Sequence, residues 1–452
     1  MSMNNNGAAS GASSNTPPFT PNCLSTCVDY LKVRVNFSYE DNRERFKTLL
    51  FDILHIYDYE MHRDKGRNAY ETTCKLAVGT TLSFGGRFTI TRDGFHTSLL
   101  EMTGLGCRDF ELRYLRSHKD LGYLTNEYII REGWIKLFEE LISMGGVCTR
   151  IDLPTDDYSG NITISEMKEK IKRKEYTTRL KKFEETNSNE EVDDDEEDIG
   201  IKEPDKIRDR VTTRDAKQTG FSGTFGTRNK LQLCIYDKAA EQHNKGNHIL
   251  NKDWIRYEVR YYHKNAEQEF MLFYDALKRH KEHQHIIGCL TSVIEFKESI
   301  GDNTLSTTHK HRNETWSKWK NFINVAEKHA GFATISADPT LKSNAKWLKR
   351  EASFSFGKVA TVIDAPCNQM FYAYINYFLN RMTKEHLQVI NQYLRSKNRP
   401  VFESIEAVKV YHKSRPDYPD EICPEVIELV YQIDKEYNTP VNSSGKETKD
   451  DK

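Results

Sequence analysis

The sequence predicts an α+β protein, in which an antiparallel β-sheet is flanked by helices and followed by a mostly helical C-terminal part. Two patterns indicate this class. Several segments alternate apolar and polar residues with the period of two that suits a strand with one buried face; they are Asp29–Phe37, Cys148–Pro154, Lys230–Tyr236 and Trp254–Tyr262. Other segments repeat apolar residues at helical spacing; they are Arg43–Tyr57, Trp134–Met144, Glu166–Arg173, Asn265–Glu282, Trp316–His329, Phe371–Arg381 and Lys384–Arg395.

Composition divides the chain into regions. We expect residues 1–27 to be a disordered polar leader and residues 437–452 to be a disordered tail. Residues 28–300 form the predicted core, and residues 301–436 form a helical accessory region. Within the core, residues 181–214 are too charged and too poor in apolar residues to pack, which predicts an inserted loop. Ser165 and Thr383 are placed to cap the helices that follow them.

The net charge of −1 conceals an uneven distribution of charge. Between Glu184 and Asp205 there are twelve acidic residues and one lysine, a local balance of −11, so the rest of the chain carries +10. A basic body suits a polyanionic partner such as nucleic acid. We expect the acidic run to be a solvated linker that is dispensable for folding, although it could also lie over a basic site.

The sequence favours a cytoplasmic protein. No apolar run approaches the roughly 18–20 residues that span a bilayer, and the N-terminus lacks the apolar core of a secretory signal. The nine cysteines are scattered along the chain, which suits reduced thiols better than a disulfide framework.

Three of the predicted strands carry reactive groups on their polar faces. Asp152, Tyr236 and Glu258 each occupy a polar position of the alternation, so they would converge on one side of a shared sheet. Basic residues share that side; they are Arg150, Lys238, Arg256 and Arg260. Two carboxylates that hold a hard divalent cation, a phenol that attacks and cations that bind a phosphate would suit phosphoryl transfer on DNA. Taken singly, each residue also has a common structural explanation as a solvated, ion-paired or strand-end side chain.

Five segments resemble, in order, the blocks of one family. They are LLEMTGLGCRDFE (99–111), TRIDLPTDDYSG (149–160), LQLCIYDKAAE (231–241), WIRYEVR (254–260) and LKSNAKWLKREASFSFGKV (341–359). The family is that of the trans-acting initiators of Gram-positive rolling-circle plasmids, with the related relaxases of integrative conjugative elements. The resemblance covers roughly Asp29 to Arg395, most of the chain.

The resemblance implies a DNA nickase that starts rolling-circle replication. Tyr236 would attack a scissile phosphate and form a 5′-phosphotyrosine, leaving a 3′ hydroxyl that primes a host polymerase. Asp152 and Glu258 would hold Mg²⁺ or Mn²⁺, with Asp156 or Asp157 as further candidate ligands. The remaining predicted site residues are Glu241 as a third ligand or base, Lys238 as a catalytic phosphate contact, and Arg150, Arg256, Arg260, Lys346, Lys349 and Arg350 as DNA contacts.

The implied partners are origin DNA, single-stranded or cruciform, and a host helicase, because the sequence contains no GxxxxGK[ST] phosphate loop. A homodimer is also possible. The two His-x-His triplets, 283–285 and 309–311, have polar centres and are interpreted as surface residues rather than metal ligands. Tyr158, in a polar turn near Asp152, is the main rival nucleophile.

Two alternative functions stay open from the sequence. One is a conjugative relaxase with the same chemistry. The other is a non-catalytic DNA-binding regulator, in which the basic stretch around Trp347 grips DNA; that stretch could equally be an amphipathic helix that packs Trp347 inward. Nicking and covalent attachment would separate an enzyme from a regulator.

Overall fold

The computed structural model describes residues 24–67, 69–86, 96–118, 124–187, 220–244, 253–298, 311, 313–329, 331–332, 348, 367–396, 399–422 and 426–427. The chain forms two compact units: Met1–Ser343 with Gln388–Val401, and Asn344–Leu387 with Phe402–Lys452. Among the described residues, no helix is long and apolar enough to cross a membrane. Residues 1–23 of the predicted leader, the predicted tail and residues 188–214 of the predicted loop lie outside the described residues, whereas the end of the predicted disordered leader, Leu24–Thr26, is a buried strand.

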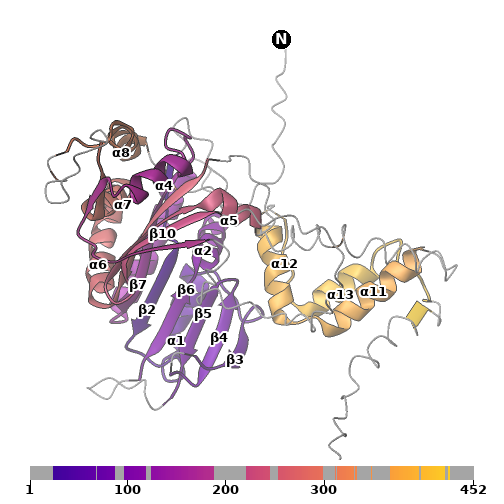
Figure 1. The fold of residues 1–452 in the computed structure, drawn as a ribbon. Coiled ribbons are helices and arrows are strands. Elements are labelled where there is room, and N and C mark those ends of the chain that lie inside the picture. The colour runs from indigo at the N-terminus through magenta and orange to yellow at the C-terminus, as the bar shows by residue number, and fades with distance from the viewer. Residues whose placement is uncertain are drawn as a thin grey trace, which may run out of the picture. The chain divides into compact units, whose positions relative to one another are not determined.

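The first unit is built on one large β-sheet, which contains twelve strands in the described part of the chain (Figure 1). The main path runs β3 (His62–Lys65), β4 (Thr72–Ala77), β5 (Thr80–Phe84), β6 (Ser98–Met102), β2 (Tyr30–Val35), β7 (Val147–Asp157), β12 (Ile255–Tyr262), β11 (Leu231–Asp237), β10 (Phe221–Thr227) and β9 (Phe183–Asn187). Every neighbouring pair on this path is antiparallel. The short strand β1 (Leu24–Thr26) pairs with the end of β7 and with β14 (Gly331–Phe332). The predicted α+β class with an antiparallel sheet is confirmed.

The central strand β7 is longer than the alternation predicted. It continues past Pro154 to Asp157, because its last residues pair with β1 on one side and β12 on the other. Pro154 fits inside the strand because its carbonyl still accepts a hydrogen bond from the Cys27 amide at 3.3 Å. Strand β7 therefore extends the polar face by one further position, Asp156.

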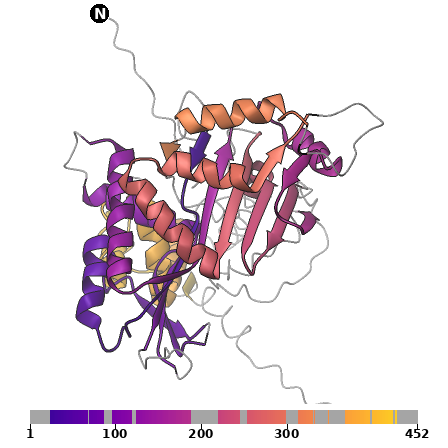
Figure 2. The same ribbon diagram turned by 90° about the vertical axis from the view of Figure 1, so that its left-hand side faces the viewer.

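Helices cover the apolar face of the sheet. Figure 2 shows α6 (His263–Lys278), α7 (Glu282–Val293) and α8 (Ser317–His329) lying across this face. The helices α2 (Gly104–Ser117) and α3 (Asn126–Ser143) belong to the same continuous core, in which Phe138 of α3 stacks on Phe270 of α6 at 4.1 Å between ring centres. Burial on this side leaves the opposite face of β7, β12 and β11 for polar groups.

The remaining described elements of this unit are short. They are α1 (Arg43–Lys47), the π-helical turn η1 (Thr48–Ile53), α4 (Ile164–Lys172), α5 (Lys238–Asn244), β8 (Tyr176–Thr178) and β13 (Ile294–Phe296). The strands β8 and β13 form a separate two-stranded sheet. The helix predicted over Arg43–Tyr57 therefore ends earlier, at Ile53.

Four local predictions need correction. The helix predicted over 265–282 spans His263–Lys278 instead, because the chain turns at His280, which has a left-handed φ of 57°, and the next helix begins at Glu282. Helix α4 is capped by Thr163, not Ser165, through a capping box with Glu166. The segment 183–187 is not part of a loop but forms strand β9, because its backbone pairs with β10 despite its charged side chains. The helix α2 was not predicted.

The described residues of the second unit are mainly helical. It contains α11 (Cys367–Arg381) and α13 (Ile405–Lys413), which pack together, and α12 (Lys384–Ser396) begins in it. The Tyr372 hydroxyl accepts a hydrogen bond from Arg415, and the Tyr372 ring lies 4.7 Å from that of Tyr418. The predicted helices near 371–381 and 384–395 are confirmed, and Thr383 lies at the start of α12, where its hydroxyl accepts from the His386 amide.

Candidate active site

The strands β11, β12 and β7 bring the predicted reactive residues onto one face. The registers place Tyr236 opposite Arg256, Cys234 opposite Glu258, and Gln232 opposite Arg260. Across the other edge of β12, Arg260 lies opposite Asp152 and Arg256 opposite Asp156. Directly opposed residues of antiparallel strands point to the same side. Asp152, Glu258 and Tyr236 therefore share one sheet face, as their alternation predicted.

The phenol of Tyr236 is in direct contact with a carboxylate. Its hydroxyl donates a hydrogen bond to Glu258 Oε2 at 3.0 Å, and the ring is partly exposed. Burial raises the pKa of Tyr236 well above its usual value of 10, and the Glu258 charge raises this pKa further. The phenol is thus held neutral until a cation or a proton acceptor assists it.

Lys238 and Glu241 lie beside this tyrosine at the start of α5. The Lys238 ammonium is 5.4 Å from the centre of the Tyr236 ring and forms an ion pair with Glu241 at 2.6 Å. Lys238 is only 6% exposed, so in this structure its charge is matched by Glu241 rather than presented to solvent. Both predicted residues are therefore near the phenol, in one ion pair.

Asp152 and Glu258 are almost fully buried and are linked by arginines. Arg260 Nε lies 2.9 Å from Glu258 Oε1 and 3.9 Å from Asp152 Oδ2, and Arg150 Nη2 lies 2.7 Å from Asp152 Oδ2. Burial raises the pKa of Asp152 to about 7, against the opposing charge of Arg150. Burial alone would also raise the pKa of Glu258, but Arg260 and Arg256 outweigh it and hold this pKa at about 2. The pair thus combines one permanent carboxylate with one that exchanges a proton near neutrality.

Arg256 lies on the predicted sheet face, but it is enclosed there by carboxylates. Its guanidinium is fully buried and binds both oxygens of Asp156, through Nε at 2.7 Å and Nη2 at 2.8 Å. The Trp254 indole donates to the same carboxylate at 2.8 Å. We refer to this group, Asp156, Arg256 and Trp254, as the arginine clamp. In it, Asp156 holds a guanidinium rather than facing a metal, and Arg256 is enclosed by carboxylates rather than facing a phosphate.

Asp29 is a candidate site residue that the sequence did not reveal. Its Oδ2 accepts from Arg256 Nη1 at 2.8 Å, its amide donates to the Asp152 carbonyl at 3.0 Å, and its charge contributes to the raised pKa of Tyr236. Alternation along the first strand would place Asp29 on the apolar side, but the residue precedes β2, where the chain passes from β1. One residue of the sequence reflects the position of Asp29. Gly104, at the start of α2, lies so close to it that a Cβ there would be 2.9 Å from Asp29 Oδ1.

The rival tyrosines are buried elsewhere. Tyr257 and Tyr261 point to the helix-covered side of β12, as predicted, and Tyr257 packs on Trp319 and Phe322. Tyr158 is 1% exposed, has its hydroxyl 3.2 Å from the Ser25 hydroxyl and packs on the Trp254 ring. Of these tyrosines, Tyr236 alone is partly exposed.

Several other predicted site residues do not lie beside Tyr236, Asp152 and Glu258. Asp157 lies at the neighbouring position of β7, on the opposite parity, and accepts from the Ser159 amide at 2.8 Å. Lys346, Lys349 and Arg350 lie outside the described residues. The interpretation of His283 and His285 as surface residues is wrong: His283 is 8% exposed and bonds to Thr26 at 2.7 Å, and His285 pairs with Glu269. Both lie on α7, which packs against the sheet.

Parts of the chain are similar to known proteins. The family model described as "Replication initiation factor" matches residues 146–370, a range that contains Asp152, Tyr236 and Glu258. The chain is 26% identical over 300 residues to "Putative DNA relaxase NicK" of Bacillus subtilis, covering 65% of this chain and 70% of that protein. It is also similar to the solved structure of a rolling circle replication initiator protein from Geobacillus stearothermophilus, with a TM-score of 0.46 and 21% identity over 67% of this chain and 97% of that chain.

Proposed function

Because the chain belongs to the family of replication initiation factors, we propose that it starts rolling-circle replication by nicking one strand of its origin DNA, with Tyr236 as the nucleophile. The observation that carries this proposal is the contact between a partly exposed phenol and a buried carboxylate on the polar sheet face. A phenol in such a position is the group that an acyl or phosphoryl transfer enzyme activates through an adjacent base.

The proposed reaction is one transesterification. The Tyr236 oxygen attacks the scissile phosphorus, a new phosphorus–oxygen bond forms, and the bond to the 3′ oxygen breaks. The phenol proton leaves towards Glu258, which already accepts its hydrogen bond, and the departing 3′ oxygen takes up a proton. The 5′ end stays on the protein as a phosphotyrosine, and the reverse reaction closes the strand. The bond energy is conserved in the ester, so no nucleotide is consumed.

The polar face carries donors of the kind that a divalent cation binds, but in this structure Asp152, Glu258 and Asp29 are each ion-paired with an arginine, so a cation would have to displace those contacts. Asp152, Glu258 and Asp29 offer carboxylate oxygens, the ligands that Mg²⁺ and Mn²⁺ prefer, and no soft ligand is needed. We propose that these three residues hold the cation. When bound, it would polarise a phosphate oxygen and stabilise the phenolate. Burial raises the pKa of Asp152, which disfavours the ionised form that a metal ligand requires.

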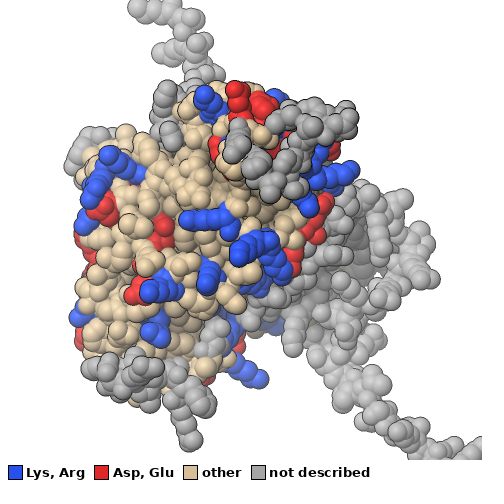
Figure 3. All heavy atoms as spheres, turned by 60° about the vertical axis from the view of Figure 1, so that its left-hand side comes forward, with Lys and Arg blue, Asp and Glu red and all other residues tan. Residues whose placement is uncertain are grey.

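The surrounding arginines have two proposed roles. Arg150 and Arg260 are 11% and 14% exposed in their side chains and flank the carboxylates, so they can contact the DNA backbone. The arginine clamp instead fixes the strand positions around Tyr236. Figure 3 shows Lys and Arg side chains in several small groups across one face of the molecule, interspersed with Asp and Glu. We propose single-stranded or cruciform origin DNA as the ligand of the polar sheet face.

The regions of the chain receive matching roles in this proposal. Residues 28–300 would form the nicking core, and residues 301–436, with Lys346, Lys349 and Arg350, would form an accessory DNA-binding region. The free 3′ hydroxyl would prime a host polymerase behind a host helicase, because the sequence has no phosphate loop of its own. A homodimer would place two nucleophiles at one origin.

A conjugative relaxase is the second candidate function. The observation that favours it is the similarity to a Bacillus subtilis protein that is itself named a putative DNA relaxase. Both functions use the same nick and the same residues. They differ in the DNA that is recognised: a replication origin in one case and a transfer origin in the other.

The proposal is tested on purified protein with supercoiled plasmid that carries the origin of the element encoding the chain. With Mg²⁺ or Mn²⁺, we expect conversion to relaxed circles and protein that stays attached to DNA on a denaturing gel. The control is the same plasmid without the origin. A protein that binds the origin but neither relaxes it nor becomes attached under either metal would contradict the proposal and favour the non-catalytic regulator.

A further inference from the structure

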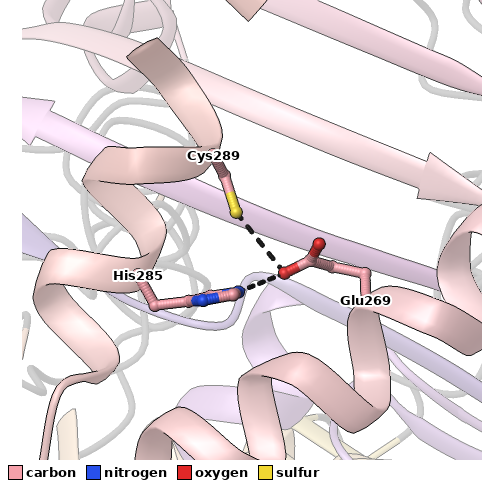
Figure 4. Close-up of side chains that lie close together, drawn as sticks. All are labelled: Glu269, His285 and Cys289. Carbon is pink, nitrogen blue, oxygen red and sulfur yellow. Dashed lines mark hydrogen bonds and ion pairs between the residues drawn. The ribbon is translucent and has the colours of Figure 1, made fainter. Parts of the chain in front are cut away.

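A second group of metal-ligating side chains lies behind the sheet, away from the polar face. Glu269 of α6, with His285 and Cys289 of α7, brings its ligand atoms within 4.8 Å of one another (Figure 4). The Glu269 carboxylate lies at the centre: its Oε1 bonds to His285 Nε2 and accepts from the Cys289 thiol at 3.4 Å. We call these three residues the α6–α7 cluster. The sequence did not reveal it, because its members are spread over two helices.

The cluster has the ligand chemistry of zinc. Zn²⁺ is bound in proteins by thiolate, imidazole and carboxylate groups at about 2.0–2.3 Å, so its ligand atoms lie roughly 3–4 Å apart. The separation between Cys289 Sγ and Glu269 Oε1 already falls in this range. His285 and Cys289 are four residues apart on one helix, which places both on the same helical face.

The charge balance of the cluster also points to a cation. Glu269 is 6% exposed, and among the described residues its one ion-pair partner is His285; Arg179 lies near enough to lower the pKa of Cys289 but forms no ion pair with Glu269. A buried carboxylate needs a compensating positive charge. A protonated imidazole or a metal ion can supply it, and the neighbouring thiol gives the metal a ligand that a simple ion pair does not use.

A neighbouring cluster of potential metal ligands already contains a cation. Glu127, Glu282 and His283 also lie within 4.8 Å of one another, but Arg131 binds both carboxylates, at 3.1 Å and 2.6 Å. A guanidinium already occupies the place of a cation there. The α6–α7 cluster is therefore the site of the two that calls for a metal.

We propose that Glu269, His285 and Cys289 bind a zinc ion, with water in the fourth position. Binding replaces the thiol proton of Cys289, and the proton on the imidazole where one is present, and releases them to solvent. Tyr261 of β12 has a hydrogen bond with Cys289, so its hydroxyl can donate to the bound thiolate as an outer partner. The ion would tie α6 and α7 to the back of the strand that carries Glu258, and it does not depend on the proposed nicking function.

The experiment uses the full chain without DNA. Elemental analysis first measures zinc in protein that was purified without chelator. A second sample is treated with chelator and dialysed, and Co²⁺ is then added as a spectroscopic substitute for zinc. We expect about one zinc ion per chain and a thiolate-to-Co²⁺ charge-transfer band in the near ultraviolet. Cys289→Ser should abolish the band, and His285→Gln should weaken zinc affinity by roughly tenfold or more.

Three control variants test whether the Co²⁺ band comes from the α6–α7 cluster. His283→Gln alters the neighbouring group and Cys148→Ser removes another buried thiol; both should retain the band, as should Tyr236→Phe. Absence of the band in the folded parent protein would overturn the proposal without any variant. A band that persists in folded Cys289→Ser, as adventitious binding would give, would overturn it as well. Failure of nicking with an intact band would concern the proposed function alone.

Discussion

The Tyr236 hydroxyl and the Glu258 carboxylate lie 3.0 Å apart on adjacent antiparallel strands. They are not directly opposed in the ladder, since Tyr236 faces Arg256 and Glu258 faces Cys234. The contact is thus a diagonal one between neighbouring positions on the same sheet face. This geometry joins the predicted nucleophile to a carboxylate that stays ionised at neutral pH, because Arg260 and Arg256 outweigh the effect of burial on the Glu258 pKa.

Replacing Glu258 by glutamine tests this contact. Glu258→Gln keeps the shape of the side chain but removes the charge that accepts the phenol proton and balances Arg260. We expect initial nicking rates to fall by roughly 10²-fold or more, with partial rescue by higher Mn²⁺. The control is Glu169→Gln, which removes a carboxylate from α4 that pairs with Arg173 at 2.6 Å. A folded Glu258→Gln protein that nicks at the parental rate would exclude the proposed role.

A variant of Asp156 distinguishes its role in the arginine clamp from a role as a metal ligand. Asp156→Asn leaves the buried Arg256 guanidinium with one carboxylate, Asp29, in place of two. We expect a loss of about 3–5 kcal/mol in the free energy of unfolding, which is typical of a broken buried ion pair. The measurement is urea denaturation, with nicking followed over a range of Mn²⁺ concentrations. Unchanged stability together with recovery of nicking at high Mn²⁺ would show instead that Asp156 is a metal ligand.

Tyr158 is expected to be structural. Tyr158→Phe removes the hydrogen bond to the Ser25 hydroxyl and keeps the ring on Trp254. The cost should be about 1 kcal/mol of unfolding free energy, and both nicking and covalent attachment should stay near the parental level. Loss of the protein–DNA adduct in this variant, on a denaturing gel with single-stranded origin DNA, would transfer the nucleophile to Tyr158.

The buried Glu60 predicts an acid-sensitive fold. Burial alone would raise the pKa of Glu60, but Arg113, at 2.8 Å and 2.9 Å, and Arg395 outweigh it and lower the pKa from 4.5 to about 2. A lowered pKa stabilises the fold above the unfolded value of 4.5, and this stability is lost as the pH falls towards 2. We expect Glu60→Gln to be less stable than the parent at pH 7, by up to about 3 kcal/mol.

Urea denaturation at a series of pH values measures this effect. The difference in unfolding free energy between parent and Glu60→Gln should shrink as the pH falls from 4.5 to 2. The control is Glu44→Gln, which removes one partner of an exposed pair with Lys47 and should change stability little at any pH. A difference that stays constant across this window would show that the Glu60 charge is not the source.

The sequence predicted the polar face of the site because strand alternation is a local property. Asp152, Glu258 and Tyr236 follow the period of two, and the registers place them where this period requires. It could not predict that Asp29 joins them, because the chain before β2 departs from regular alternation. Nor could it show that Arg256 is enclosed by two carboxylates, since this depends on which strands are neighbours.

Element boundaries depended on features that local patterns do not contain. The helix predicted over 265–282 ends at Lys278 because the chain turns at His280, and the polar run 278–285 contains no glycine that would have marked this end. Strand β9 is rich in charge and was predicted as a loop; its backbone pairing with β10 outweighs the composition of its side chains. The histidines of α7 looked exposed because their neighbours are polar, whereas the carboxylates that hold them come from α3 and α6.

The account rests most directly on the identity of the tyrosine that becomes linked to DNA. The measurement is mass spectrometry of tryptic peptides after the parent protein has reacted with single-stranded origin DNA and Mn²⁺. Cleavage after Lys230 and Lys238 gives the peptide LQLCIYDK, in which Tyr236 is the single tyrosine. We predict that the nucleotide mass is found on this peptide and that it disappears, with nicking, in Tyr236→Phe. Nucleotide mass on the peptide that begins at Ile151 and contains Tyr158, or an adduct that persists in Tyr236→Phe, would contradict the account.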